Sequence, residues 1–196
     1  MKRRAGPGVL IAFLVALSAH AADVSVSTRH QGGAIIVEAS AEVPGRTGQA
    51  WTVLTDYERL SSFIPNMASS RVVARSKAGP VIEQKGVARF LVFSYPIEVR
   101  LVVAEFPPNR IEARGVSGSF KKFRGVYSLN VARGRTQLHY VCEMVPDFFV
   151  PPIVGTAILQ RNVEESFGAL VDEIVRRHEA PGMRPESRAD GAARAQ

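Results

Sequence analysis

The stretch PPIVGTAILQRNVEESFGALVDEIVRRH, from Pro151 to His178, is the one long segment of the chain whose apolar residues recur at helical period. At about 100° per residue, one side of this helix carries Ile153, Ala157, Val163, Phe167, Leu170, Val171, Ile174 and Val175. The opposite side carries Arg161, Glu165, Asp172, Glu173 and Arg176. A helix with one apolar side must bury that side against another layer of the fold.

The sequence also marks both ends of this helix. Pro151-Pro152 stands where the first turn has no use for backbone N–H groups. Arg176-Arg177-His178 places positive charge at the negative end of the helix dipole, and Pro181-Gly182 stops the helix from continuing. The pattern therefore predicts one long helix near the end of the chain.

Two polar residues, Gln160 and Glu164, lie one turn apart inside the predicted apolar arc. Each needs a partner, because an unpaired polar group is costly to bury. Two interpretations stay open. Either both sit at the edge of the stripe and reach solvent or a sheet arginine such as Arg89 or Arg100, or both face an apolar cavity and orient the polar head of a ligand.

From Ser70 to Val145 the apolar period changes to two, which is typical of strands separated by short turns. Strands are expected near 70–76, 80–93, 95–105, 110–117, 120–131 and 136–145. Two alternating sets are expected to face inward: Ile97, Val99, Leu101 and Val103, and Leu138, Tyr140, Cys142 and Met144.

Before this meander, Ala34 to Val43 predicts a first strand, and GQAWTVLTDYERLSSFIPNM (48–67) predicts two short helices that meet near Asp56 and end at Pro65. The expected fold class is α+β: a curved antiparallel sheet of six to seven strands wrapped around one long C-terminal helix, with two short helices after the first strand.

Residues 1–21 have the pattern of a signal peptide: a basic start at Lys2-Arg3-Arg4, an apolar run Val9 to Leu17, and the small-x-small site Ala19-His20-Ala21. A membrane anchor is the alternative, but the run is about half of the ~20 residues that a span needs. We expect a flexible lead or short edge strand over 22–33, one domain over 34–180, and a disordered tail over 181–196. The expected location is periplasmic or secreted, after cleavage near Ala21.

The composition favours no catalytic or nucleic-acid-binding class. Loss of the three basic residues of the signal lowers the net charge from +7 to +4, a mild excess that suits an anionic membrane surface. His30, His139 and His178 have neither metal-ligand spacing nor the arrangement of a triad, so we expect no metal and no cofactor. Cys142 has no second cysteine to pair with and is expected to be an inert buried thiol.

Three segments together carry a resemblance to a known family: AWTVLTDYERLSSFIPNM (50–67), GSFKKFRGVYSLNV (118–131) and TQLHYVCEMVPDFFVPP (136–152), followed by the amphipathic helix. In this order they resemble the START-like or SRPBCC superfamily with its helix-grip fold. The branch they are most similar to is the polyketide cyclase and coenzyme-Q-binding group. The resemblance covers about Ala34 to His178.

The layout predicts a ligand cavity between sheet and helix, lined by Phe90, Phe123, Tyr127, Tyr140, Met144, Gln160, Glu164 and Phe167. A solid core filled by these side chains is the alternative. The resemblance places the cavity mouth at the loop before the helix, where Phe148, Phe149, Val150 and Ile153 are expected to form a portal or membrane contact. Ordinary packing under the helix remains the alternative for this loop.

Three functions are consistent with these features. The first is an exported carrier of a lipid or isoprenoid-like molecule, with transient membrane contact, no nucleic-acid partner and no enzymatic activity. The second, implied by the family, is an aromatase/cyclase-type enzyme in which Glu164 works with Tyr127 or Tyr140 as acid and base. The third is a protein-interaction module without a ligand. Ligand identity and oligomeric state stay open.

Overall fold

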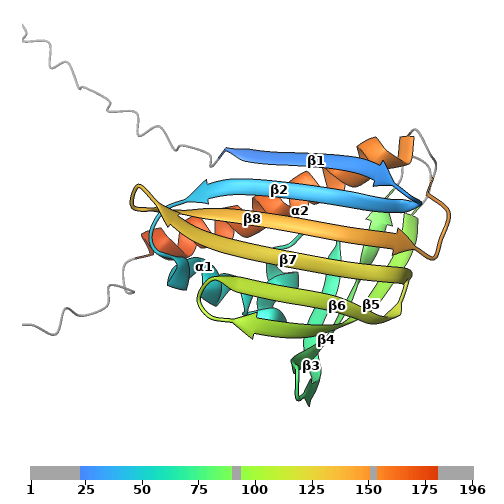
Figure 1. Cartoon of the computed structure of the whole chain (residues 1–196), viewed down its shortest axis with the longest axis horizontal. Coiled ribbons are helices and arrows are strands. Elements are labelled where there is room, and N and C mark those ends of the chain that lie inside the picture. The colour runs from blue at the N-terminus through green and yellow to red at the C-terminus, as the bar shows by residue number, and fades with distance from the viewer. Residues whose placement is uncertain (1–22, 90–93, 151–153, 181–196) are drawn as a thin grey trace, which may run out of the picture.

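A computed structural model describes residues 23–89, 94–150 and 154–180 of the chain. In chain order the elements are β1 (Val24–Gln31), β2 (Ala34–Val43), α1 (Thr47–Leu54), the short 3-10 helix η1 (Tyr57–Ser62), β3 (Met67–Ser76), β4 (Gly79–Arg89), β5 (Ser94–Phe106), β6 (Arg110–Gly118), β7 (Phe120–Ala132), β8 (Arg135–Pro146) and α2 (Val154–Glu179). Within these residues the strands form one antiparallel sheet in the order β1-β2-β8-β7-β6-β5-β4-β3, and α2 crosses behind it in the view of Figure 1.

The α+β class, the antiparallel sheet and the single long C-terminal helix are as the sequence predicted, but the sheet has eight strands where six to seven were expected. The additional strand is β1, in the segment expected to be a flexible lead or short edge strand. It pairs with β2 along its whole length, from Val24↔Ala41 to Gln31↔Ala34. Gly32 and Gly33 both have positive φ in the connecting turn, the conformation that a two-residue hairpin of this kind requires.

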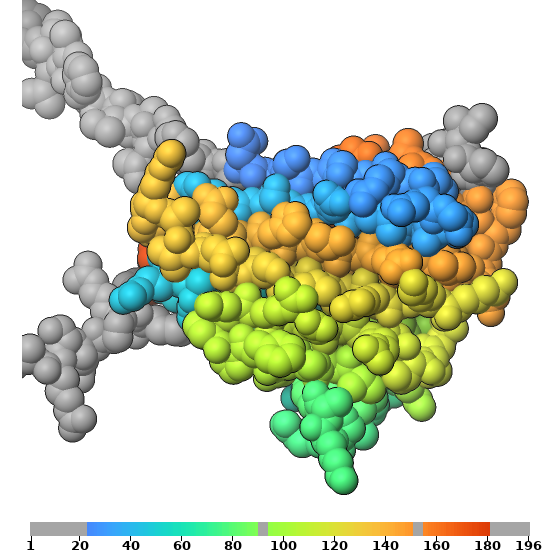
Figure 2. All heavy atoms as spheres, viewed as in Figure 1, coloured from blue at the N-terminus to red at the C-terminus, as the bar shows by residue number. Residues whose placement is uncertain are grey.

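The alternation along the sheet agrees with the sequence. Val99, Leu101 and Val103 of β5 are buried, as are Leu138, Cys142 and Met144 of β8, while Glu98, Arg100 and His139 are exposed. The outer face of the sheet is therefore the charged one. In Figure 2 the side chains of β1, β2, β8 and β7 cover this face without a gap, and the β3–β4 hairpin projects from one end.

Helix α2 packs against β1, β2, β4 and α1. Its C-terminal half is buried through Phe167, Leu170, Val171 and Ile174, which join the main core. Glu173 was expected on the solvent side, yet it is only 7% exposed. Its carboxylate is covered because Arg176 and Arg177 both donate hydrogen bonds to it, at 2.6–2.7 Å.

Arg177 also fixes the end of α2 to the two short helices. Its Nη2 lies 2.9 Å from Asp56 Oδ2, and its guanidinium lies over the ring of Phe63, 5.9 Å from the centroid. His178 Nδ1 lies 2.7 Å from Gln49 Oε1 of α1. These contacts hold α1 and η1 at one end of the space between the sheet and α2. Among the helices that the structure describes, none is both long and apolar enough to cross a membrane.

Candidate functional site

The space between the sheet and α2 is not filled by side chains. It holds two adjoining cavities, of about 240 Å³ and about 330 Å³. We call the smaller one the tip cavity, because Phe148 and Val150 from the chain after β8 line it, and the larger one the central cavity, because Leu101, Tyr127 and Phe167 line it. A solid core, the alternative left open by the sequence, is therefore excluded.

The central cavity has an aromatic wall that the sequence predicted. Phe123, Tyr127, Tyr140 and Phe167 all line it. Tyr127 of β7 and Tyr140 of β8 are direct cross-strand partners, and their rings stack at 4.3 Å between centroids. Burial raises the pKa of both tyrosines above the ordinary value of 10, so both hydroxyls stay protonated at neutral pH.

A second aromatic cluster borders the tip cavity, which Phe120 and Phe148 line. Phe148 stacks on Tyr95 of β5 at 4.4 Å and meets Phe120 of β7 edge-on at 6.1 Å. Met144 and Val150, both predicted site residues, also line this cavity. Phe149 lies next to them in the chain but points outward and is 74% exposed. Two further predicted residues, Phe90 and Ile153, lie outside the described residues.

The prediction that Gln160 and Glu164 face a cavity is wrong. Glu164 is exposed, Gln160 is half-buried, and neither lines either cavity. Gln160 Nε2 donates to Glu164 Oε1 at 3.0 Å and to the Val26 carbonyl of β1 at 3.4 Å. The edge-of-stripe interpretation holds, but with β1 and solvent in place of a sheet arginine. The cause is β1, which covers this side of α2 and leaves a different side toward the cavities.

Three polar side chains that the sequence analysis did not select face the cavities instead. Gln84 of β4 and Asn162 and Ser166 of α2 line both cavities. A signal for each was present in the sequence. Gln84 lies two residues after the buried Ile82 and therefore on the same inner face of β4. Asn162 and Ser166 are four residues apart, each next to an apolar residue of the helix, Val163 or Phe167.

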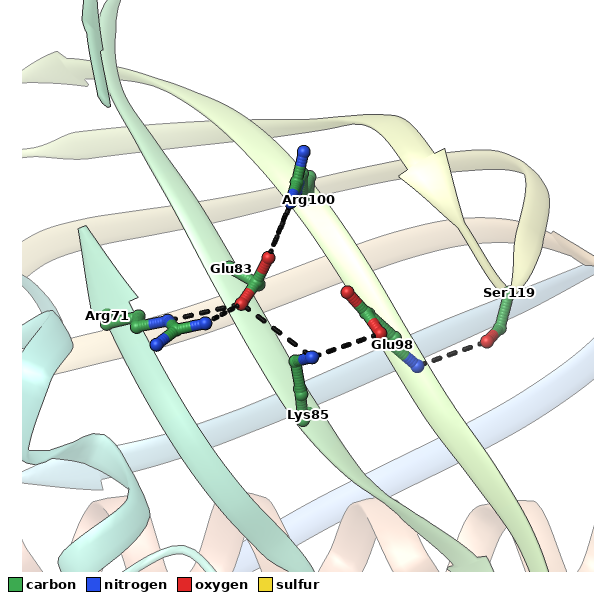
Figure 3. A network of polar contacts seen from close by, with 6 residues as sticks. All are labelled: Arg71, Glu83, Lys85, Glu98, Arg100 and Ser119. Atoms are coloured by element: carbon green, nitrogen blue, oxygen red, sulfur yellow. Dashed lines mark hydrogen bonds and ion pairs between the residues drawn. The ribbon is translucent and has the colours of Figure 1, made fainter. Parts of the chain in front are cut away.

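Charge is kept out of the cavities. Of the described residues that line them, Lys85 alone carries a formal charge. Its ammonium turns to the outer face, where it lies 3.3 Å from Glu98 Oε2 (Figure 3). The same face holds Glu83, 2% exposed, which accepts hydrogen bonds from Arg71 at 3.1 Å and Arg100 at 3.0 Å.

The outer-face network keeps Glu83 ionised beside three cationic side chains. Hydrogen bonds from Arg71 and Arg100, with the nearby Lys85 charge, lower the pKa of Glu83, so the carboxylate stays ionised and holds the cations on the outside of the sheet. Figure 3 shows Arg71, Arg100 and Lys85 converging on Glu83 from β3, β5 and β4. The interior of the site is thereby left apolar, with neutral polar groups only.

Groups suited to acid–base or metal chemistry do not meet in this site. Within the described residues no carboxylate or histidine lines either cavity, so the pairing of Glu164 with Tyr127 or Tyr140 is not formed. His30 lies outside the cavities, where its Nε2 is 2.6 Å from Thr156 Oγ1. Cys142 is buried, and its pKa is raised to about 12 by burial. No group of three or more potential metal ligands comes together in the described part of the chain.

Known proteins support the same fold. The family model described as polyketide cyclase / dehydrase and lipid transport matches residues 43–165. A START superfamily protein from Mycobacterium smegmatis is 17% identical, with a TM-score of 0.60 over 73% of this chain and 98% of that one. The Zhui aromatase/cyclase from a Streptomyces species is 18% identical, with a TM-score of 0.61 over 76% and 98%.

A STAR-related lipid transfer protein from Xanthomonas axonopodis is 11% identical, with a TM-score of 0.62 over 80% of this chain and 94% of that one. Among curated proteins, none matches the sequence. At these identities the structural similarities show the shared START-like fold, and the similar proteins include both an aromatase/cyclase and a lipid transfer protein.

Proposed function

The chain belongs to the polyketide cyclase / dehydrase and lipid transport family, and on that premise we propose that it binds an apolar small molecule between its sheet and α2 and carries it to a membrane surface. The observation that most supports this proposal is the pair of adjoining cavities with apolar and aromatic walls. An empty apolar cavity costs stability, whereas each buried methylene of a ligand contributes about 0.8 kcal/mol. The open space between sheet and helix is therefore best explained as a binding site for an apolar ligand.

The chain between β8 and α2 suggests how the ligand enters and leaves. Phe148 and Val150 line the tip cavity, and Phe149 between them presents its ring to solvent. An exposed phenylalanine between two residues that line an apolar cavity is suited to insertion into the surface of a bilayer. We therefore assign the contact with membrane to this tip.

Export is part of the proposal. It rests on the signal-peptide pattern of residues 1–21, which lie outside the described residues. Sequencing the N-terminus of protein from the periplasm of the native host should give Ala22 as the first residue. An intact Met1 in the membrane fraction would contradict export and favour an anchor.

An aromatase/cyclase activity is the second candidate, favoured by the Tyr127–Tyr140 pair in the wall of the central cavity. Two protonated hydroxyls can donate hydrogen bonds to a substrate carbonyl and to the enolate formed from it. Cyclisation also needs a base, and no described carboxylate or histidine lines the cavities to act as one. Carriage is therefore the better-supported function.

Native mass spectrometry of protein purified from its own host tests carriage directly. We expect a bound apolar molecule on the wild type and its loss from Ser166→Phe, because a ring at this position occupies space shared by both cavities. Glu165→Phe places the same ring on an exposed neighbour and should retain the ligand. Wild-type protein that carries nothing from its host and takes up no apolar compound in vitro would refute the proposal.

A further inference from the structure

The position of the polar groups in the site carries information about the ligand. Gln84, Asn162 and Ser166 line both cavities, so they lie where the tip cavity and the central cavity adjoin. On either side of them the walls are mainly apolar, with Phe120 and Phe148 in one cavity and Phe123 and Phe167 in the other. These three side chains are thus central to the combined space, whereas the other neutral polar groups line one cavity only: Asn66 in the tip cavity, and the hydroxyls of Tyr57, Tyr127 and Tyr140 in the central cavity.

These three side chains retain hydrogen-bonding capacity. Gln84 Nε2 donates to Ser70 Oγ, and Asn162 Nδ2 donates to the Arg89 carbonyl, both at 3.4 Å, the long limit of a hydrogen bond. Each amide has a second N–H and a carbonyl oxygen available. Ser166 takes part in none of the side-chain hydrogen bonds among the described residues. A ligand oxygen at this point can therefore be met by amide N–H donors and a hydroxyl.

The same surroundings disfavour an ionised ligand. Among the described residues of the lining, Lys85 is the one that carries a charge, and it is held by Glu98 and Glu83 on the outer face. An anion in the cavities would lose its hydration without gaining a cation, which costs far more than burying a neutral oxygen with a hydrogen bond.

We propose that the native ligand carries an uncharged oxygen function, a carbonyl or a hydroxyl, near its middle, with an apolar segment on each side. The oxygen binds at Gln84, Asn162 and Ser166, and one apolar segment occupies each cavity. This assignment rests on the proposed function, since it specifies the class of molecule that the carrier binds.

Four compounds of equal chain length test the assignment by calorimetry or by displacement of a fluorescent lipid probe. They are the central ketone 8-pentadecanone, the terminal ketone 2-pentadecanone, the hydrocarbon pentadecane, and pentadecanoate at a pH where it is ionised. We expect the central ketone to bind about tenfold more tightly than the other three, the effect of roughly one good hydrogen bond.

Three variants then locate the oxygen. Asn162→Leu and Ser166→Ala should each lower the preference for the central ketone over pentadecane by several-fold without weakening the binding of pentadecane. Gln160→Leu is the matched control, because it removes an amide from the same helix outside the cavities, and it should keep the full preference. Circular dichroism of each variant checks that the fold is retained, and the small Ser166→Ala change tests the site even where Asn162→Leu does not fold.

The possible outcomes separate the two proposals. Equal affinity of the wild type for all four compounds, or tightest binding of pentadecanoate, would overturn the central neutral oxygen and leave the carrier function standing. A ketone preference that survives both cavity variants would overturn the assignment of the oxygen to Asn162 and Ser166. Failure of the wild type to bind any of the four would count against the carrier function itself.

Discussion

The Glu173→Gln substitution should weaken the protein in a pH-dependent way. Hydrogen bonds from Arg176, together with those from Arg177, lower the pKa of Glu173 from 4.5 to about 2. At 1.36 kcal/mol per pKa unit this corresponds to about 3 kcal/mol, and exposure of the Arg176 side chain to solvent reduces the expectation to about 2 kcal/mol. The loss is a large part of the 5–15 kcal/mol that typically stabilises a domain.

The direction with pH follows from the lowered pKa. The folded protein binds this proton less readily than the unfolded chain, so the stabilisation is complete above about pH 4.5 and disappears as the pH falls toward 2. Urea unfolding at a series of pH values should therefore show a gap of about 2 kcal/mol between wild type and Glu173→Gln at neutral pH. The gap should close between pH 4.5 and 2.

Asp172→Asn is the matched control, because Asp172 is the exposed neighbour on the same turn. It should change the free energy of unfolding by less than about 0.5 kcal/mol. A Glu173→Gln protein as stable as the wild type at neutral pH would refute the reasoning. So would a deficit that stays constant down to pH 2, since the ionised carboxylate would then not be its cause.

Two further predictions concern the tip and the core. Phe149→Asp should change the free energy of unfolding by less than about 0.5 kcal/mol, because the ring is 74% exposed, yet it should slow ligand transfer between vesicles. Val131→Asp is the control, because Val131 is 54% exposed on the sheet, and it should leave the transfer rate unchanged. A large fall in Tm for Phe149→Asp would show that the ring is packed. Cys142 should resist alkylation in the native protein at pH 8 and react on unfolding, because burial raises its pKa to about 12; rapid labelling of the folded protein would contradict its burial.

The parts of the fold that depend on local pattern could be predicted from the sequence. Alternation along β5 and β8 identified the inner faces correctly, since a strand has only two faces and the charged residues occupy one of them. The helical period of α2 and its end near His178 were equally local. Phe123, Tyr127, Tyr140 and Phe167 were placed in the cavity wall on the same grounds.

The parts of the fold that depend on residues far apart in the sequence could not be predicted in full. For residues 22–33 the sequence left a flexible lead and a short edge strand open, and the edge strand is the one that forms, because β2 accepts β1 along its whole length. The rotation of α2 depends in turn on β1, which is why Gln160 and Glu164 were assigned to the cavity in place of Asn162 and Ser166. Glu173 was assigned to solvent because its burial requires two arginines of the next turn to fold back over it.

The packing of α2 against β1 and β2 has a consequence for how the chain is made. The first two strands that the structure describes, residues 24–43, meet the last helix, residues 154–179, so the core is closed by its two most distant parts. A ribosome releases the N-terminal strands long before Phe167 and Ile174 leave the tunnel, and contacts of such long range form slowly. On this arrangement the core cannot be completed before the last helix has been synthesised, a property that would suit the export proposed above.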